Sequence, residues 1–203
     1  GRGGNQADYT PAESSINYPA VNINNVTITE NVFGGGLGLT ATVTANPHVT
    51  IGDNVEGHEV TILMSVYGGG SLAGVAGNTN VVVNSGTIGT PQDGETVYGG
   101  AEYGNIYGGG LGTEVISASM TEAQAVKEAG IIKGNTTITV NGWTVLHNIY
   151  GGGANGSVGT FTYDGENVIS GYTSGGLATI NILGGTIGTN GHENGMIFGF
   201  SRG

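Results

Sequence analysis

Short runs in which apolar and polar residues alternate cover most of the chain. In one such run, Val26 and Ile28 share one face of an extended strand, and Thr27 and Thr29 share the other. Comparable runs follow at residues 40–44, 60–67, 79–83, 136–140 and 178–182. A period of two is typical of a strand with one buried face, so the pattern predicts an all-β chain.

A second pattern, an aromatic residue after a β-branched one and before glycine, recurs along the chain. Its copies are centred on Phe33-Gly34, Tyr67-Gly68-Gly69, Tyr98, Tyr107-Gly108-Gly109, Tyr150-Gly151 and Phe198. An aromatic side chain suits a pleated surface, while glycine permits a positive φ and leaves room for a neighbouring backbone. The regularly placed copies lie 34 to 48 residues apart, which indicates a repeat array with loops of variable length.

The repeats predict how the strands are arranged. A strand of four to six residues cannot bury its apolar face alone, so equivalent strands are expected to stack about 4.8 Å apart. Inner Val and Ile side chains then form ladders, aromatics stack on aromatics, and glycines occupy the corners. We expect a right-handed parallel β-helix of five or six coils. An antiparallel β-sandwich is the alternative, because Asn141-Gly142 and Asn155-Gly156 are also hairpin signals.

The pattern also divides the chain. Residues 1–20 lack periodicity and form a polar lead-in, and residues 21–203 form the β-helix repeat domain. One short helix is expected as an insertion at about 119–130, because Ser119 and Glu122 form a capping box and Gly130 can end the helix. The chain starts without Met and stops within a repeat-like run, so we expect it to be an excerpt of a longer protein.

Composition and charge narrow the choice of partners. The 203 residues include 43 glycines but only four prolines, and 37% are hydrophobic, which is typical neither of collagen nor of a disordered linker. Fifteen acidic residues against four basic ones give a net charge of −11. Nucleic acid and anionic membranes need clustered basic residues, so neither is an expected partner. No apolar run approaches the roughly 20 residues that span a bilayer, so membrane insertion is not expected either.

The amino-acid sequence of the repeats resembles that of a known group of proteins. The runs TNVVVNSGTIG with TVYGGA, and ATINILGGTIG with MIFGF, resemble the glycine-rich GGTIG…VYGGG repeats of large exported bacterial surface proteins. Those proteins are similar to the β-helical, adhesin-like, autotransporter-type passenger family. The resemblance covers residues 21–200. It implies an extracellular or cell-surface location and a structural or adhesive role, and it carries no catalytic residue with it.

An enzyme is the competing class, because polysaccharide lyases and hydrolases also use the β-helix. Such lyases rely on a basic residue beside calcium-binding carboxylates. Here Arg2 and Arg202 stand near the chain ends, and Lys127 and Lys133 lie in or after the expected helix. We therefore expect a non-enzymatic module with no catalytic residue. A β-helical polysaccharide lyase or hydrolase, or a calcium-dependent carbohydrate-binding module, is the alternative.

Acidic residues gather in the loops between the strand runs. Carboxylate oxygens on a loop can hold Ca²⁺. The candidates are Asp53, Glu56, Glu59, Asp93, Glu95, Asp164 and Glu166. Their spacing matches neither the EF-hand nor the glycine-rich calcium repeat, so solvated loops are the simpler interpretation. No other cofactor is expected.

The last residues of the chain are apolar. A β-helix ends in a coil whose N–H and C=O groups are unpaired, unless something caps it. We expect Ile197, Phe198 and Phe200 to mediate self-association. The predicted partners are copies of the same chain in a homo-oligomer or filament, or neighbouring repeats of the chain. A surface glycan or protein is a further predicted ligand.

Overall fold

The computed structural model describes residues 19–90, 104–113, 127–164, 168–189 and 194–203. These residues form three five-stranded sheets and one two-stranded sheet. The first sheet contains β1 (Ala20–Ile23), β4 (His48–Ile51), β7 (Thr79–Val83), β10 (Thr136–Val140) and β15 (Ala178–Ile182). The second contains β2 (Val26–Ile28), β5 (Val60–Ile62), β8 (Thr87–Ile88), β11 (Thr144–Val145) and β16 (Thr186–Ile187). The third contains β3 (Val32–Phe33), β6 (Val66–Tyr67), β9 (Ile106–Tyr107), β12 (Ile149–Tyr150) and β17 (Ile197–Phe198).

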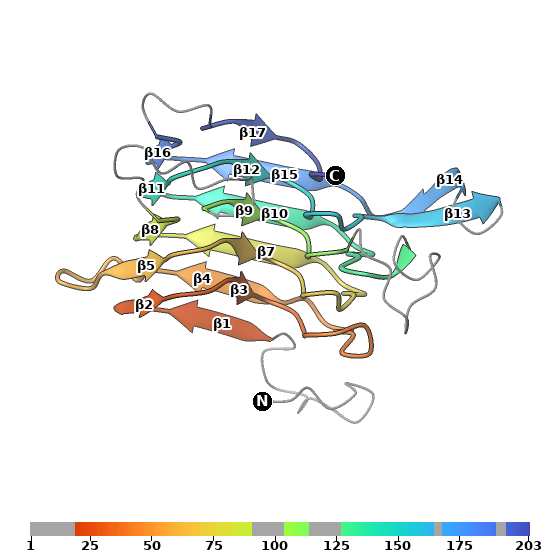
Figure 1. Cartoon of the computed structure of the whole chain (residues 1–203), viewed down its shortest axis with the longest axis horizontal. Coiled ribbons are helices and arrows are strands. Elements are labelled where there is room, and N and C mark those ends of the chain that lie inside the picture. Colours follow the sequence, from red (N-terminus) through yellow and green to blue (C-terminus); the bar gives the residue numbers. More distant parts are fainter. Residues whose placement is uncertain (1–18, 91–103, 114–126, 165–167, 190–193) are drawn as a thin grey trace.

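The chain passes through the three sheets in the same order five times. Strands β1–β3, β4–β6, β7–β9, β10–β12 and β15–β17 therefore make up five coils, which we number from the N-terminal end. Figure 1 shows the coils stacked from β1 to β17. All pairing within the three large sheets is parallel and in register. The expected all-β, solenoid-like repeat architecture is confirmed, and the antiparallel sandwich is wrong for these sheets.

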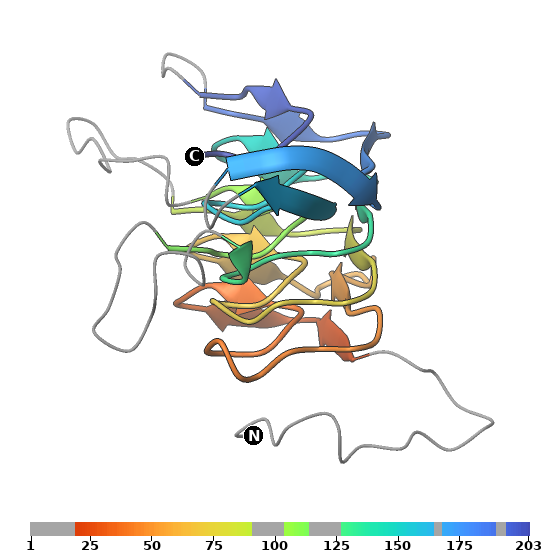
Figure 2. The same cartoon turned by 90° about the vertical axis from the view of Figure 1, so that its right-hand side faces the viewer.

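One antiparallel pair of strands is present in the described part of the chain. Strands β13 (Thr160–Asp164) and β14 (Val168–Ser174) form a hairpin between the fourth and fifth coils. The hairpin projects to one side of the stack (Figures 1 and 2). Gly175 and Gly176, which follow β14, both have positive φ, so the chain turns there before it enters β15. The insertion therefore leaves the register of the fifth coil unchanged.

The core runs as ladders of like residues through the stack. In the first sheet, Val49, Val81, Ile138 and Ile180 face one another in successive coils. The first three are fully buried. Burial of an aliphatic side chain of this size contributes about 1.5–3 kcal/mol. Because each ladder position repeats in every coil, the period-two pattern of one strand indicates which side chains belong to the same ladder in all five coils.

The aromatics form a single stack beside the third sheet. Its members are Phe33, Tyr67, Tyr107, Tyr150 and Phe198. Neighbouring ring centroids are 4.7 to 5.0 Å apart, and the planes lie within 13° of parallel. The predicted aromatic stacking is confirmed for these five residues. Tyr98, the remaining aromatic of the repeat motif, lies outside the described residues.

The glycines after each aromatic are needed for close backbone approach. None of Gly34, Gly68, Gly108 or Gly151 has a positive φ, so these positions use the space that glycine leaves and not the left-handed conformation that it permits. A Cβ on Gly108 would lie 2.3 Å from the carbonyl oxygen of Gly151, and one on Gly68 would lie 2.4 Å from that of Gly108. The second glycines, Gly69 and Gly109, are equally confined. Successive coils therefore touch backbone to backbone along this row.

Two expected segments fall largely outside the described residues. The polar lead-in covers residues 1–20, of which 1–18 are not described, and the expected helix covers 119–130, of which 119–126 are not described. The end of that insertion is visible as a turn at 128–130. Gly130 has a φ of 67°, the left-handed conformation expected of a residue that ends a helix.

The close backbone contacts at the glycines after each aromatic predict that adding one methyl group changes the free energy of unfolding by an amount that depends on the coil. Gly108→Ala should lower the free energy of unfolding by about 3 kcal/mol or more, because the Cβ meets a backbone carbonyl that cannot move alone. Gly199→Ala is the matched control. Gly199 holds the equivalent position in the fifth coil, and a Cβ added there would have no atom from elsewhere in the described structure within 4 Å. Denaturant unfolding measures both. Equal stability of the two variants would contradict the packing argument.

Candidate functional site

The fifth coil exposes side chains that the inner coils bury. Ile197 and Phe198 are 49% and 39% exposed, whereas Ile149 and Tyr150, their partners in the fourth coil, are 0% and 6% exposed. Phe200 is exposed as well. The three residues expected to mediate self-association thus lie on one exposed coil. We call the outer surface of this coil the fifth-coil face, formed by Leu177, Ile182, Leu183, Met196, Ile197, Phe198 and Phe200.

The backbone of the fifth coil is also unpaired on one side. Strands β15, β16 and β17 each stand last in their sheet, so within the described part of the chain each has a single neighbour. Figure 1 shows these strands together at one end of the stack. A row of free N–H and C=O groups is a template for another strand. The fifth-coil face therefore combines apolar side chains with three open strand edges.

Polar side chains link each coil to the next at the corner just before the third sheet. Each side-chain oxygen accepts the backbone N–H of the equivalent residue one coil later. The links run from Asn31 to Ser65 (2.9 Å), from Ser65 to Asn105 (3.1 Å), from Asn105 to Asn148 (3.0 Å) and from Asn148 to Met196 (2.8 Å). Ser65, Asn105 and Asn148 are buried. Losing one such acceptor would leave a buried amide unsatisfied, which costs about 1–3 kcal/mol.

A second ladder of the same kind occupies the corner just before the first sheet. Asn46 Oδ1 accepts the N–H of Asn78 (2.7 Å), and Asn78 Oδ1 accepts that of Asn135 (2.8 Å). Asn135 Oδ1 then accepts the N–H of Leu177 (3.0 Å). As in the first ladder, every bond connects a side chain of one coil to the backbone of the next.

A third corner follows the first sheet. Asn84 and Asn141 come directly after β7 and β10, and the Nδ2 of Asn141 donates to the Oδ1 of Asn84 (2.8 Å). Leu183 comes directly after β15 and therefore holds the same position in the fifth coil. At all three corners the fifth coil thus replaces asparagine with a larger apolar residue.

Sequence reasoning missed these three corner residues of the fifth coil, Leu177, Leu183 and Met196. All three are exposed large apolar side chains. The signal was present in the aligned repeats, since Asn135-Thr136-Thr137 of the fourth coil aligns with Leu177-Ala178-Thr179 of the fifth. Finding it required the strand register, because the loops between the repeats differ in length.

The fifth-coil face is almost uncharged. Among residues 177–189 and 194–203, the one charged side chain is Arg202. The whole chain carries a net charge of −11. The acidic residues therefore lie elsewhere or in segments that are not described, and this face carries little electrostatic repulsion against a similar surface.

A groove runs along the corner between the second and third sheets. It encloses about 300 Å³ and is lined by residues from all five coils, namely Thr29, Leu63, Met64, Gly89, Thr90, Gly104, Leu146, His147, Thr189 and Asn194. The hydroxyls of Thr90 and Thr189 donate to the carbonyls of Leu63 and Leu146, at 3.0 and 3.1 Å. The two hydroxyl donors are therefore used within the protein.

His147 is the titratable group of the groove. Its Nδ1 lies 2.9 Å from Asn105 Oδ1 and 3.0 Å from Asn148 Nδ2. Burial lowers the pKa of His147 below its ordinary value, and the positive charge of Arg202 lowers it further. Both effects favour the neutral imidazole, which is consistent with a histidine that is held in a polar corner of the fold.

Trp143, the single tryptophan, combines a positive φ with high exposure. Its φ is 82°, and its side chain is 55% exposed. The equivalent positions in the third and fifth coils hold Gly86 and Gly185, which also have positive φ. A bulky residue in this conformation is strained, and strain of this kind occurs often at functional sites. Sequence reasoning did not select Trp143, because the strain depends on the backbone.

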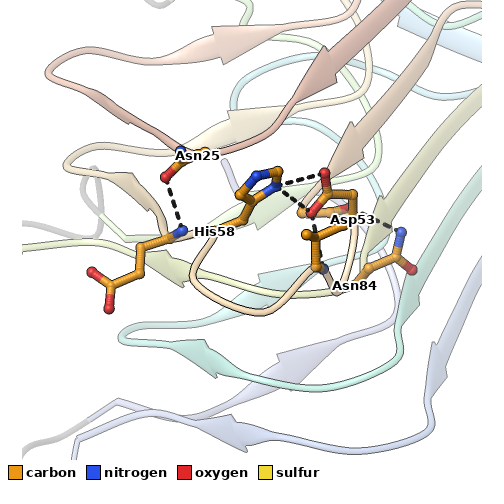
Figure 3. Close-up of polar contacts among 7 residues, drawn as sticks. Asn25, Asp53, His58 and Asn84 are labelled. Atoms are coloured by element: carbon orange, nitrogen blue, oxygen red, sulfur yellow. Dashed lines mark hydrogen bonds and ion pairs between the residues drawn. The ribbon is translucent and has the colours of Figure 1, made fainter.

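The acidic loop after β4 is organised by an ion pair (Figure 3). Asp53 contacts His58 Nδ1 through both carboxylate oxygens, at 2.9 and 3.1 Å, and accepts the N–H of Val55 at 3.2 Å. Burial acts to raise the pKa of Asp53, but these hydrogen bonds and the charge of His58 outweigh it and leave the pKa below its ordinary value. The same loop is tied to the neighbouring coils by Asn25 and Asn84.

The remaining calcium candidates are not brought together by the described structure. Glu56 and Glu59 are exposed on the loop of Asp53, and Asp164 is exposed at the end of β13. Asp93, Glu95 and Glu166 lie outside the described residues. Within the described ranges, no three His, Asp or Glu side chains are close enough to hold a metal ion together. Calcium binding stays a prediction.

Comparison of the chain with family models, curated proteins and solved structures finds no match. None of the described helical turns is long and apolar enough to cross a membrane. The site and the fold therefore carry the functional argument.

The lowered pKa of His147 predicts how stability depends on pH. As the pH falls through 6.5, the unfolded chain binds a proton before the folded one does, so the free energy of unfolding should fall with the pH. His147→Gln should reduce this dependence. Burial also lowers the pKa of His48, so His48→Gln with His147→Gln should reduce it further. Urea unfolding from pH 5 to 8 measures the effect, and an unchanged slope in the double variant would contradict it.

Proposed function

We propose that the chain is a non-enzymatic structural or adhesive repeat module that works outside the cell or on its surface. In this proposal the five coils form a right-handed parallel β-helix that joins end to end with copies of itself or with neighbouring repeats of a longer chain. The product is a fibre or a longer array. The observation that carries the proposal is the fifth-coil face, where core residues and strand edges are both exposed.

Two physical arguments support this function. Ile197 and Phe198 continue ladders that are buried one coil further in, and covering an apolar side chain of this size contributes about 1.5–3 kcal/mol. The free edges of β15, β16 and β17 need backbone donors and acceptors, which another β-structure supplies. A surface built in this way is suited to receive another protein strand layer.

The extracellular location and the absence of catalysis rest on different arguments. The location rests on the resemblance of the repeats to those of exported surface proteins. The non-enzymatic assignment rests on the scatter of the basic residues. In the described part of the chain these are Lys127, Lys133 and Arg202, and the Lys127 ammonium lies 4.4 Å from the centre of the Tyr163 ring. Turnover of a glycan panel, with or without Ca²⁺, would instead support the carbohydrate-active alternative.

End-to-end association predicts a strong effect of charge on the fifth-coil face. The purified chain should form assemblies larger than one copy, visible by light scattering and negative-stain microscopy. Ile197→Glu with Phe198→Glu should abolish them, because two carboxylates would be buried without partners. Val55→Glu, at an exposed position on the second-coil loop between β4 and β5, is the control and should leave them intact. A strictly monomeric wild-type chain at high concentration would overturn the proposal.

A glycan contact at Trp143 is a second candidate function, favoured by the exposed ring on a strained backbone. A flat apolar ring with a polar N–H edge suits the face of a sugar. Trp143→Gly should leave the free energy of unfolding unchanged or raise it by up to about 1 kcal/mol, because glycine stands at the equivalent positions of two other coils.

The same variant should lose binding on a neutral glycan array, while Trp143→Phe should keep part of it. A destabilisation of more than about 1 kcal/mol on Trp143→Gly would show that the indole has a packing role instead. Equal glycan binding by wild type and variant would also contradict this function.

A further inference from the structure

The ladders of side-chain hydrogen bonds at the corners stop at the fifth coil. In the first four coils, side-chain oxygens accept an N–H from the coil that follows. At the same positions the fifth coil has Leu177 and Met196, whose side chains offer no such oxygen. A sixth coil stacked in the same parallel manner would place its corner N–H groups against apolar side chains. The fifth-coil face is therefore unsuited to continue the ladder.

The first coil is a poor match for this face. If a second copy stacked head to tail, its first coil would lie on the fifth coil, and the amide of Asn31 would face Met196. Two ladder positions are also less open in the first coil, because Ile23 and Val32 are buried while their fifth-coil equivalents, Ile182 and Ile197, are exposed. Head-to-tail stacking thus joins an open apolar face to a more closed and more polar one.

We propose that the fifth-coil faces of two copies pack against each other, tail to tail, about a two-fold axis. This inference rests on the proposed function, and it specifies which surface of the chain joins two copies. In a two-fold pair the strand edges run antiparallel, and antiparallel edges can form a regular hydrogen-bond ladder. The apolar corners of one copy then meet those of the other. The pair needs no oxygen acceptor from Leu177, Leu183 or Met196.

The charge distribution favours the same partner. Each chain has a net charge of −11, so most surfaces of two copies repel each other. The fifth-coil face has one charged side chain, Arg202, among residues 177–189 and 194–203, so two such faces approach with little repulsion. The occupant must also supply backbone donors and acceptors to three strand edges. A second copy of the face meets both requirements, whereas a lipid or glycan surface supplies no regular row of backbone donors and acceptors.

The first test replaces the apolar corner residues of the fifth coil with the asparagines that the fourth coil has at the same positions. The triple variant Leu177→Asn, Leu183→Asn, Met196→Asn carries the asparagines that stand at these positions as Asn135, Asn141 and Asn148. Sedimentation equilibrium of the full chain should show wild-type pairs of the 20.3 kDa protein, and the variant should pair at least about tenfold more weakly. Leu37→Asn is the matched control. Unchanged pairing of the triple variant would overturn the inference.

A second variant separates the two ways of stacking. Val26 is exposed on the first coil, so Val26→Lys would block head-to-tail contacts and leave tail-to-tail pairs intact. Circular dichroism and thermal unfolding check that each variant keeps its fold. Open-ended growth that Val26→Lys abolishes would overturn the tail-to-tail geometry and leave the proposed function standing. Wild-type chains that stay monomeric would overturn both.

Discussion

The whole structure depends on parallel strands that stack in register, one coil above the next. At this spacing a strand side chain packs against the equivalent side chain of each neighbouring coil, so each strand position must suit copies of itself. Aliphatic residues satisfy the condition in the core, parallel rings satisfy it in the aromatic stack, and glycine satisfies it where the backbones touch. Asparagine satisfies it at the corners, because its amide oxygen can accept an N–H from the next coil.

This constraint explains why so much of the fold could be predicted from the sequence. The period-two runs and the aromatic-glycine motif repeat because the structure repeats, so the parallel ladders and the aromatic stack followed from the pattern at Tyr67, Tyr107 and Tyr150. At Gly68 and Gly108 the sequence indicated room for a neighbouring backbone, which the structure shows, whereas the positive φ that glycine also permits is not used there. Which residues pair in the corner ladders depends on the strand register, since Asn105 and Asn148 are 43 residues apart in the sequence.

The candidate site was predicted in part for the same reason. Ile197, Phe198 and Phe200 stood out because they belong to a recognisable last repeat. Leu177 and Leu183 did not, because a single leucine is ordinary until its register shows that asparagine stands there in the neighbouring coil. Trp143 also escaped detection, because the feature that marks it is a backbone angle. Departures from a repeat are informative only once the repeat has been aligned in space, and here the departures at the asparagine corners gather in the fifth coil.

The corner ladders also give the chain a direction. Each asparagine oxygen in them accepts an amide from the coil that comes later in the sequence, as from Asn105 to Asn148 and from Asn78 to Asn135. A coil that forms on an earlier one therefore finds its acceptors already in place, whereas a coil that forms first leaves its corner amides without them. Chains emerge from synthesis with the N-terminal part first. The ladders thus favour folding that advances one coil at a time as the polypeptide becomes available, with each finished layer serving as the template for the next.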